Sequence, residues 1–196
     1  LHVVDRYLKT VKHLGIKNDN LGLDFFLSTI DKIDISIFPK DYIVFVIGGQ
    51  HATKILPNEK IISIIKKVNK PVLLVGGPED FERGEQIIAN TNNTINTCGK
   101  YSILQSASLV QQAKMVITHD TGMMHIAAAF QQKIFSVWGN TVPEFGMYPY
   151  LESEQSKRIE VKGLNCLPCS KIGYDKCPKG HFKSMQEIDE NLFLSE

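Results

Sequence analysis

The stretch THDTGMMHIAAA, residues 118–129, places an acid, a hydroxyl, a glycine and a histidine in front of an apolar segment. Asp120 is in position to be the N-cap of the helix that the alanine run predicts, with its carboxylate accepting one of the first free amides. Thr121 and Gly122 would offer further amides, and free N–H groups at the positive end of a helix dipole bind anions. His125 follows Thr121 by four residues, so both are expected on one helical face near that anion. The stretch therefore predicts an anion site, although a capped helix with a structural histidine explains it as well.

Three further polar loops follow predicted strands. Residues 48–54, GGQHATK, supply Thr53 and Lys54, a hydroxyl and a cation that can meet a phosphate. Glu79 ends the text GGPE and is placed to accept hydrogen bonds from ribose hydroxyls, and Thr141 ends the text GNT. Neither the Gly-Lys-Ser/Thr of a P-loop nor the Gly-x-Gly-x-x-Gly dinucleotide fingerprint is present in these loops. Four such loops at one edge of a sheet indicate a nucleoside diphosphate site.

The elements that must position these loops alternate between strand and helix patterns. Short β-branched runs predict strands, and apolar residues at helical spacing predict helices between them. The predicted strands are residues 42–47, 71–77, 94–99, 115–118 and 133–139, and the predicted helices are residues 58–68, 79–90, 102–113 and the segment that ends in the alanines. Continuous apolar strands that alternate with helices are typical of a parallel sheet covered on both faces. The predicted fold is therefore an α/β, Rossmann-like sheet with ligands beyond the carboxyl ends of its strands.

Composition and length limit the possible functions. The chain has 196 residues, of which 43% are hydrophobic and 22% charged, and these values are ordinary for one globular domain. A formal net charge of +1 gives no electrostatic argument for binding nucleic acid or an anionic membrane. No apolar run is long enough to span a bilayer, no signal peptide opens the chain, and four cysteines are too few for a disulfide scaffold. We expect a cytoplasmic protein with at most a peripheral association with the inner face of the membrane. Because the chain opens on Leu1 without a methionine, we interpret it as a fragment.

Four stretches carry a family resemblance, in the same order along the chain. Residues 48–57 with Lys54, then VGGPED, then DTGMMHIAAA, then VWGNT resemble glycosyltransferase family 9, the ADP-heptose:lipopolysaccharide heptosyltransferases. The Asp-(Thr/Ser)-Gly-x-x-His motif is the most specific part of the resemblance, which runs over nearly the whole chain. It implies the two-domain GT-B fold, with this chain as the C-terminal half that binds the nucleotide-sugar donor. On that interpretation residues 1–40 are an inter-domain linker with a helical segment, and residues 41–196 are the donor-binding domain with a cysteine-containing loop at 162–183.

The loops and the resemblance together single out a set of candidate residues for donor binding. Lys54 and the helix dipole would stabilise the departing nucleoside diphosphate, on which negative charge grows in the transition state. A carboxylate beside a diphosphate is repulsive, so Asp120 is expected to point at sugar hydroxyls instead. The candidates are Thr53, Lys54, Glu79, Asp120, Thr121, Gly122, His125 and Thr141.

The resemblance implies transfer of a heptose from ADP-heptose to a lipopolysaccharide-type acceptor, with no cofactor required. The resemblance implies that the catalytic base is an aspartate of the N-terminal domain. This chain alone is therefore expected to bind the donor, an ADP-sugar, without catalysing transfer. Two other function classes remain open from the residues: a nucleotide-sugar epimerase of the same two-domain fold, and a non-catalytic nucleotide-binding module. Lys54 together with the 120–125 motif favours a transferase over an epimerase.

A second group of residues with metal-binding chemistry lies in the cysteine-containing loop. Cys166-Leu-Pro-Cys169 is followed by Cys177 and His181, a mixture of thiolates and imidazole that suits a structural Zn²⁺. Members of the family with such tails carry a further cysteine where this chain has Ser184, so His181 would be the fourth ligand. Free or structural thiols in an irregular loop are the alternative interpretation, and a disulfide is a third.

Overall fold

A single parallel sheet organises the protein, whose computed structural model describes residues 1–194. The strand order is β3-β2-β1-β4-β5-β6, and every neighbouring pair is parallel. The strands are β1 (Ile43–Val46), β2 (Val72–Val75), β3 (Thr94–Asn96), β4 (Met115–His119), β5 (Ile134–Trp138) and β6 (Lys157–Glu160). The strand order reverses between β1 and β4, which is the topological switch point of the sheet. The chain leaves these two strands in opposite directions, and a crevice therefore opens between them at their carboxyl ends. The predicted α/β, Rossmann-like sheet is confirmed.

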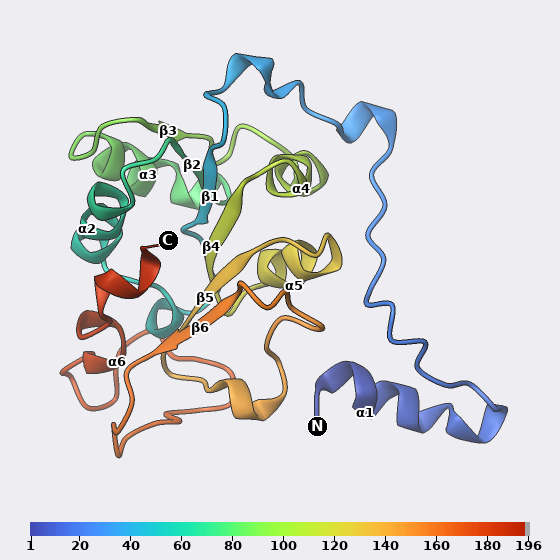
Figure 1. Ribbon diagram of the computed structural model, residues 1–196. Coiled ribbons are helices and arrows are strands. Elements are labelled where there is room, and N and C mark those ends of the chain that lie inside the picture. Colours follow the sequence, from blue (N-terminus) through green and yellow to red (C-terminus); the bar gives the residue numbers. More distant parts are fainter. Residues whose placement is uncertain (195–196) are drawn as a thin grey trace.

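Helices cover both faces of this sheet. Figure 1 shows α2 (Asn58–Val68) and α3 (Phe81–Ile88) on one side, and α4 (Ile103–Gln111) and α5 (Gly122–Ala129) on the other. Two further helices, α1 (Val3–Thr10) and the short α6 (Lys183–Gln186), lie near the ends of the chain. The predicted helix at 79–90 begins later, because Pro78–Asp80 form a 3₁₀ turn before α3.

Two apolar cores hold the layers together. Phe45 and Leu74 are fully buried against Ile61 on the side of α2 and α3. The neighbouring strand residues Val44 and Leu73 belong to the second core, on the side of α4 and α5. Since successive residues of a strand point to opposite faces and both faces are covered, the central strands have no polar alternation.

The segments outside the central sheet differ most from expectation. The edge strand β6 was not predicted, because its residues Lys157 and Arg158 are exposed and the strand has no apolar run. The helical pattern at the start of the chain gives only α1 and a 3₁₀ turn over Lys12–Leu14. Between residues 17 and 41 the chain is extended except for short turns, and it passes around the outside of the sheet domain (Figure 1). Within residues 1–194, no helix has both the length and the apolar character that crossing a bilayer requires.

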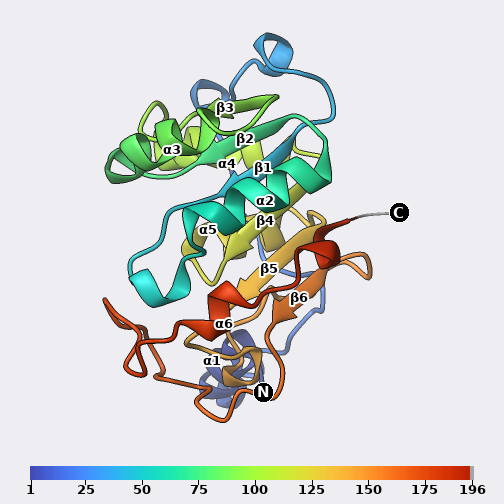
Figure 2. The ribbon, with the colours of Figure 1, turned by 90° about the vertical axis from the view of Figure 1, so that its left-hand side faces the viewer.

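The start of the chain is attached to the loop after β5. The ring of His2 is almost completely buried between Tyr148 and Tyr150, and its Nε2 donates to the Tyr148 carbonyl at 2.7 Å. Arg6 on α1 donates to the carbonyl of Phe145 at 2.8 Å. In Figure 2 this part lies at the same end of the molecule as the orange and red segment that follows β6.

Candidate functional site

A cavity of about 920 Å³ opens at the carboxyl ends of the strands, on both sides of the switch point between β1 and β4. It is lined by the loops after β1 and β2, by the first turns of α4 and α5, and by single residues from the loops after β5 and β6. A volume of this size suits a drug-sized or nucleotide-sized ligand. Six of the eight candidate donor-binding residues line it: Lys54, Glu79, Asp120, Thr121, Gly122 and His125.

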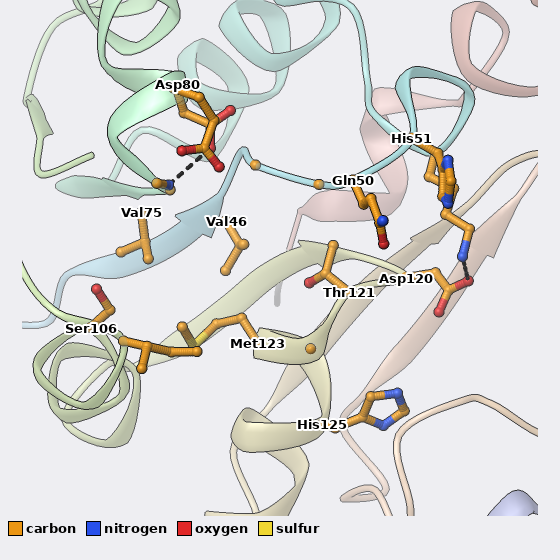
Figure 3. A pocket seen from close by; sticks show the side chains of 18 of the residues that line it. Val46, Gln50, His51, Val75, Asp80, Ser106, Asp120, Thr121, Met123 and His125 are labelled. Atoms are coloured by element: carbon orange, nitrogen blue, oxygen red, sulfur yellow. Dashed lines mark hydrogen bonds and ion pairs between the residues drawn. The ribbon is translucent and has the colours of Figure 1, made fainter. Parts of the chain in front are cut away.

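An ion pair bridges the two halves of the sheet at this cavity. The Nζ of Lys54, from the 3₁₀ turn after β1, lies 2.7 Å from Oδ2 of Asp120, which directly follows β4 (Figure 3). Thr141, from the loop after β5, donates its hydroxyl to the same carboxylate oxygen at 2.9 Å. The two charged side chains are only 15% and 8% exposed, so water screens their charges weakly. Thr141 is itself buried and reaches the cavity through Asp120.

The N-cap interpretation of Asp120 is wrong. Thr121 is the N-cap residue of α5, and no side chain accepts a hydrogen bond there. The carboxylate of Asp120 points at Lys54 and Thr141 instead, because the charged ammonium from the turn after β1 is a stronger partner than a neutral amide. The first turn of α5 is therefore left without a side-chain cap at the edge of the cavity. A Cβ added at Gly122 would meet no other atom within 4 Å, so the backbone here is open to close approach.

His125 lies beside Asp120 at the same end of the cavity (Figure 3). Burial lowers the pKa of its imidazole, and the nearby carboxylate of Asp120 partly opposes that effect. The ring is therefore neutral at pH 7 and offers one hydrogen-bond donor and one acceptor. A neutral imidazole beside a carboxylate suits the hydroxyl groups of a sugar.

The opposite end of the cavity holds two acids, Glu79 and Asp80. Glu79 is exposed and lines the cavity, and its contact with a ribose stays a prediction. Sequence reasoning missed Asp80, which is buried and accepts the amide of Gly77 at 2.9 Å. Burial raises the pKa of its carboxyl. A Cβ at Gly76 would come within 2.6 Å of Oδ2 of Asp80, so glycine at this position leaves space for that carboxylate.

The inner surface of this second end is mostly apolar. Val46 and Val75, the last residues of β1 and β2, lie there close to Ser106 on α4 and Met123 on α5 (Figure 3). Tyr101 continues this wall from the loop after β3. The loop after β3 contains Gly99 and Lys100 but no nucleotide-binding fingerprint, and the signal in the sequence was that a third predicted strand ends at the same edge.

The structure places Thr53 outside the cavity. Its side chain is buried, donates to the carbonyl of Tyr174 at 2.9 Å and accepts from the amide of Tyr174 at 2.8 Å. The hydroxyl expected to meet a phosphate thus attaches the loop after β1 to the cysteine-containing loop. Ile172, two residues earlier in that loop, lines the cavity.

The four predicted metal ligands are only partly brought together. Sγ of Cys166 lies 3.9 Å from Nε2 of His181, whereas Cys169 donates its thiol to the carbonyl of Cys166. Burial raises the pKa of the Cys169 thiol. Among residues 1–194, no group of three or more His, Cys, Asp or Glu side chains is gathered as a metal ion would require. All four cysteines of the chain, including the buried Cys98, are free thiols.

The chemistry of the cavity is therefore divided along its length. One end has an ammonium and an uncapped helix start, beside a carboxylate and an imidazole; the other end has two acids over an apolar base. Such a cavity can hold an elongated ligand that carries an anionic group between a polyhydroxyl group and an aromatic or ribosyl group.

Known proteins resemble this chain in sequence and in fold. Residues 2–177 match glycosyltransferase family 9 (heptosyltransferase). Lipopolysaccharide heptosyltransferase 2 of Escherichia coli (strain K12) is 32% identical over 130 residues, which are 64% of this chain and 35% of that protein. The structure of a family 9 glycosyltransferase from Veillonella parvula superposes with a TM-score of 0.79 at 20% identity, over 98% of this chain and 57% of that one. An Escherichia coli heptosyltransferase solved with ADP superposes with a TM-score of 0.63 at 23% identity, over 81% of this chain and 50% of that one.

The superpositions show that the Rossmann-like sheet is shared with these heptosyltransferase structures. They also show that this chain spans about half of the length of the neighbours' chains. The family match extends over most of the sequence, from the segment before α1 through all six strands to the cysteine-containing loop. This chain therefore belongs to glycosyltransferase family 9, the heptosyltransferase family.

Proposed function

We propose that this chain binds the donor of a glycosyltransferase that transfers a sugar from a nucleoside diphosphate, with ADP-heptose as donor and a lipopolysaccharide-type molecule as acceptor. The observation that carries the proposal is the Lys54–Asp120 ion pair, which lies in the cavity beside the uncapped start of α5. Two structural neighbours support the choice of donor, since one was solved with ADP and another with ADP-2-deoxy-2-fluoro heptose. The name of the Escherichia coli relative supports the choice of acceptor.

In this proposal the diphosphate binds between Lys54 and the first amides of α5. Both carry positive charge, and the helix end adds N–H donors that no side chain occupies. When the bond between the sugar and the diphosphate breaks, negative charge accumulates on the leaving phosphate. Because Lys54 is largely buried, its ammonium stabilises that charge more strongly than an exposed lysine would.

The remaining residues of the cavity orient the two ends of the donor. Asp120 and His125 accept and donate hydrogen bonds to the hydroxyls of the sugar, and Thr141 keeps the carboxylate of Asp120 in place. Glu79 accepts hydrogen bonds from the ribose, and the nucleobase packs on the apolar surface beside Met123. We propose that the catalytic base and the acceptor-binding site come from a second domain, and that the residues described here bind the donor without transferring the sugar.

The proposal is tested by isothermal titration of the chain with ADP, UDP and GDP. We expect ADP to bind most tightly. Lys54→Ala should weaken that binding by about 1.5–3 kcal/mol, the contribution of a charge-assisted hydrogen bond to the phosphate. Lys66→Ala is the matched control, because Lys66 is an exposed lysine on α2 that does not line the cavity.

Three results would contradict the proposal. If none of the three nucleotides binds, the cavity is not a nucleotide site. If Lys54→Ala binds ADP as the parent does, the ammonium does not contact the phosphate. If ADP binds but an assay with the complete enzyme shows no sugar transfer, the chain is a non-catalytic nucleotide-binding module.

A further inference from the structure

The segment that carries Lys54, residues 48–55, is held at both of its ends by one side chain. Arg83, on α3, donates from Nη1 to the carbonyl of Ile47 at 2.7 Å and from Nη2 to the carbonyl of Leu56. Ile47 directly precedes the segment and Leu56 directly follows it. A planar guanidinium carries its donors in a fixed fork, so the two carbonyls are kept at one separation.

A second side chain holds the same end of the segment from the other half of the sheet. Nε2 of His119 accepts the amide hydrogen of Leu56 at 3.0 Å, so both backbone polar groups of Leu56 are bound by side chains. His119 is completely buried in β4 and directly precedes Asp120. The strand that supplies the partner of Lys54 therefore also fixes the segment on which Lys54 is carried.

Arg83 does not line the cavity, yet it lies between two 3₁₀ turns that do, Ala52–Lys54 after β1 and Pro78–Asp80 after β2. It follows Asp80 by three residues on the same turn of chain, and its Nε donates to Oδ1 of Asn58, the first residue of α2, at 2.7 Å. Burial lowers the pKa of the guanidinium, and the charge of Asp80 opposes that effect. The residues of the cavity wall do not include Arg83. Its hydrogen bonds act on a ligand through the segment, and its charge acts on the cavity through Asp80.

We propose that Arg83 and His119 are positioning residues of the donor site, which keep Lys54 against Asp120 before a diphosphate arrives. The inference rests on the proposed function. Segment 48–55 contains two glycines and has no strand or α-helix of its own, only the 3₁₀ turn Ala52–Lys54. Without fixed ends such a segment samples many conformations, and the ligand must then bind the small fraction in which Lys54 is correctly placed. The two hydrogen bonds from Arg83 and the one accepted by His119 keep the segment in the binding conformation, so the ligand loses no affinity to the other conformations.

The test compares Arg83→Lys and Arg83→Met in titrations with ADP and with adenosine, below the unfolding temperature of every variant. Lysine keeps the positive charge but has no planar fork, so it cannot hold both carbonyls. Both variants should bind ADP about tenfold or more weakly, a loss on the scale of charge-assisted hydrogen bonds. Adenosine, which has no phosphate to meet Lys54, should bind each variant as it binds the parent. Lys66→Met is the control that removes a positive charge without touching the segment.

Two outcomes overturn the inference while leaving the proposed function intact. Unchanged ADP affinity in Arg83→Lys would mean that only charge is needed, and an equal loss for ADP and adenosine would mean that Arg83 acts on the fold as a whole. If the parent itself binds no nucleotide, the proposed function fails, and amide exchange then decides the positioning role. The amides of Lys54 and Ile55, which bond within the turn, should exchange faster in Arg83→Met, whereas that of Phe45 in β1 should not. Unchanged exchange at Lys54 and Ile55 would overturn the positioning role itself.

Discussion

A carboxylate between a strand and a helix usually caps the helix, whereas Asp120 binds Lys54 and Thr141 instead. The neighbouring His119 has the opposite character, since it is fully buried and carries no charge at pH 7. Its Nε2 accepts the amide of Leu56, which requires the ring to be unprotonated on that nitrogen. Two adjacent residues at the end of β4 therefore differ completely in chemistry: one supplies charge to the cavity, and the other supplies a neutral acceptor to the structure beneath it.

The burial of His119 predicts a dependence of stability on pH. Burial lowers the pKa of this imidazole to about 3, from 6.5 in the unfolded chain. Between these values the unfolded state binds a proton that the folded state does not, so the free energy of unfolding falls as the pH falls. Between pH 7 and pH 5 this one group should remove about 2 kcal/mol. Urea denaturation across this range should show the decrease in the parent chain and a smaller one in His119→Gln.

The control for this measurement is the exposed His13, in the 3₁₀ turn after α1. His13→Gln should keep the full pH dependence of the parent. An identical slope in His119→Gln and in the parent would show that the buried imidazole is not the group that titrates.

At the scale of the elements, α3 packs closely against the sheet at one glycine. Gly84, in the middle of this helix, faces Asn96 of β3, and a Cβ at Gly84 would lie 2.6 Å from Nδ2 of Asn96. That amide donates to the carbonyl of Phe81 at 3.0 Å and to Oε1 of Glu85 at 2.8 Å, both in α3. Asn96 thus joins β3 to α3, and the absence of a side chain at Gly84 leaves space for it. The same helix carries Arg83, so its distance from the sheet also sets where the guanidinium lies.

Gly84→Ala should destabilise the fold although alanine is the better helix former. The gain in helix propensity is about 1 kcal/mol. Overpacking against Asn96 costs about 1–3 kcal/mol, and displacement of its amide adds the loss of two hydrogen bonds. We therefore expect a net loss of about 1–2 kcal/mol in urea denaturation. Gly122→Ala is the control, because its Cβ meets nothing within 4 Å and should change stability little. A Gly84→Ala variant as stable as the parent would mean that α3 can move away from β3 freely.

The central elements were predictable because their burial leaves a direct trace in the sequence. Strands β1, β2, β4 and β5 are covered on both faces, so they appear as continuous apolar runs, and the glycine-rich text after them locates the cavity. The edge strand β6 has exposed residues and no such trace.

The site was predictable only where a residue's chemistry decides its neighbours. Lys54 and Asp120 were both expected at the carboxyl edge, and they are in contact there. Thr53 is adjacent to Lys54 in sequence but faces Tyr174, and which side of a 3₁₀ turn a hydroxyl takes depends on a loop that lies more than a hundred residues later. The roles of Arg83 and His119 depend on backbone carbonyl and amide groups, which every residue carries and no sequence pattern reveals.

At the level of the whole molecule, the cysteine-containing loop connects parts of the cavity that are far apart in sequence. Tyr174 binds Thr53 in the loop after β1, and the amide of Cys169 donates to the carbonyl of Asn140 in the loop after β5 at 2.8 Å. In addition, the side-chain amide of Asn140 donates a hydrogen bond to the hydroxyl of Ser170 at 2.9 Å. The loop therefore forms part of the cavity wall, and any ion that organises its thiols also organises that wall.

We propose a structural zinc in this loop, and its presence is measurable. Protein purified without chelator should contain close to one zinc per chain if Cys166, Cys169, Cys177 and His181 are the ligands. Because Sγ of Cys166 and Nε2 of His181 are already near each other, binding requires Cys169 and Cys177 to turn toward them. Metal analysis by mass spectrometry measures the content, and Cys177→Ser should lower it. Protein without zinc whose loop thiols all react with a labelling reagent would show free thiols instead. Cys98 is the internal control, since it is buried and its pKa is raised to about 12.

The reversal of strand order between β1 and β4 has a consequence for how the chain folds. Strands β1, β2 and β3 come from one continuous stretch of sequence, and β4, β5 and β6 come from the next. Each stretch can form its own pairs from neighbouring segments, whereas the register of Ile43 with Met115 requires two distant parts of the chain to meet. The cavity lies across that junction, with Lys54 on one side and Asp120 on the other. During folding the ligand site therefore does not grow gradually with the sheet; it comes into existence when the two half-sheets join.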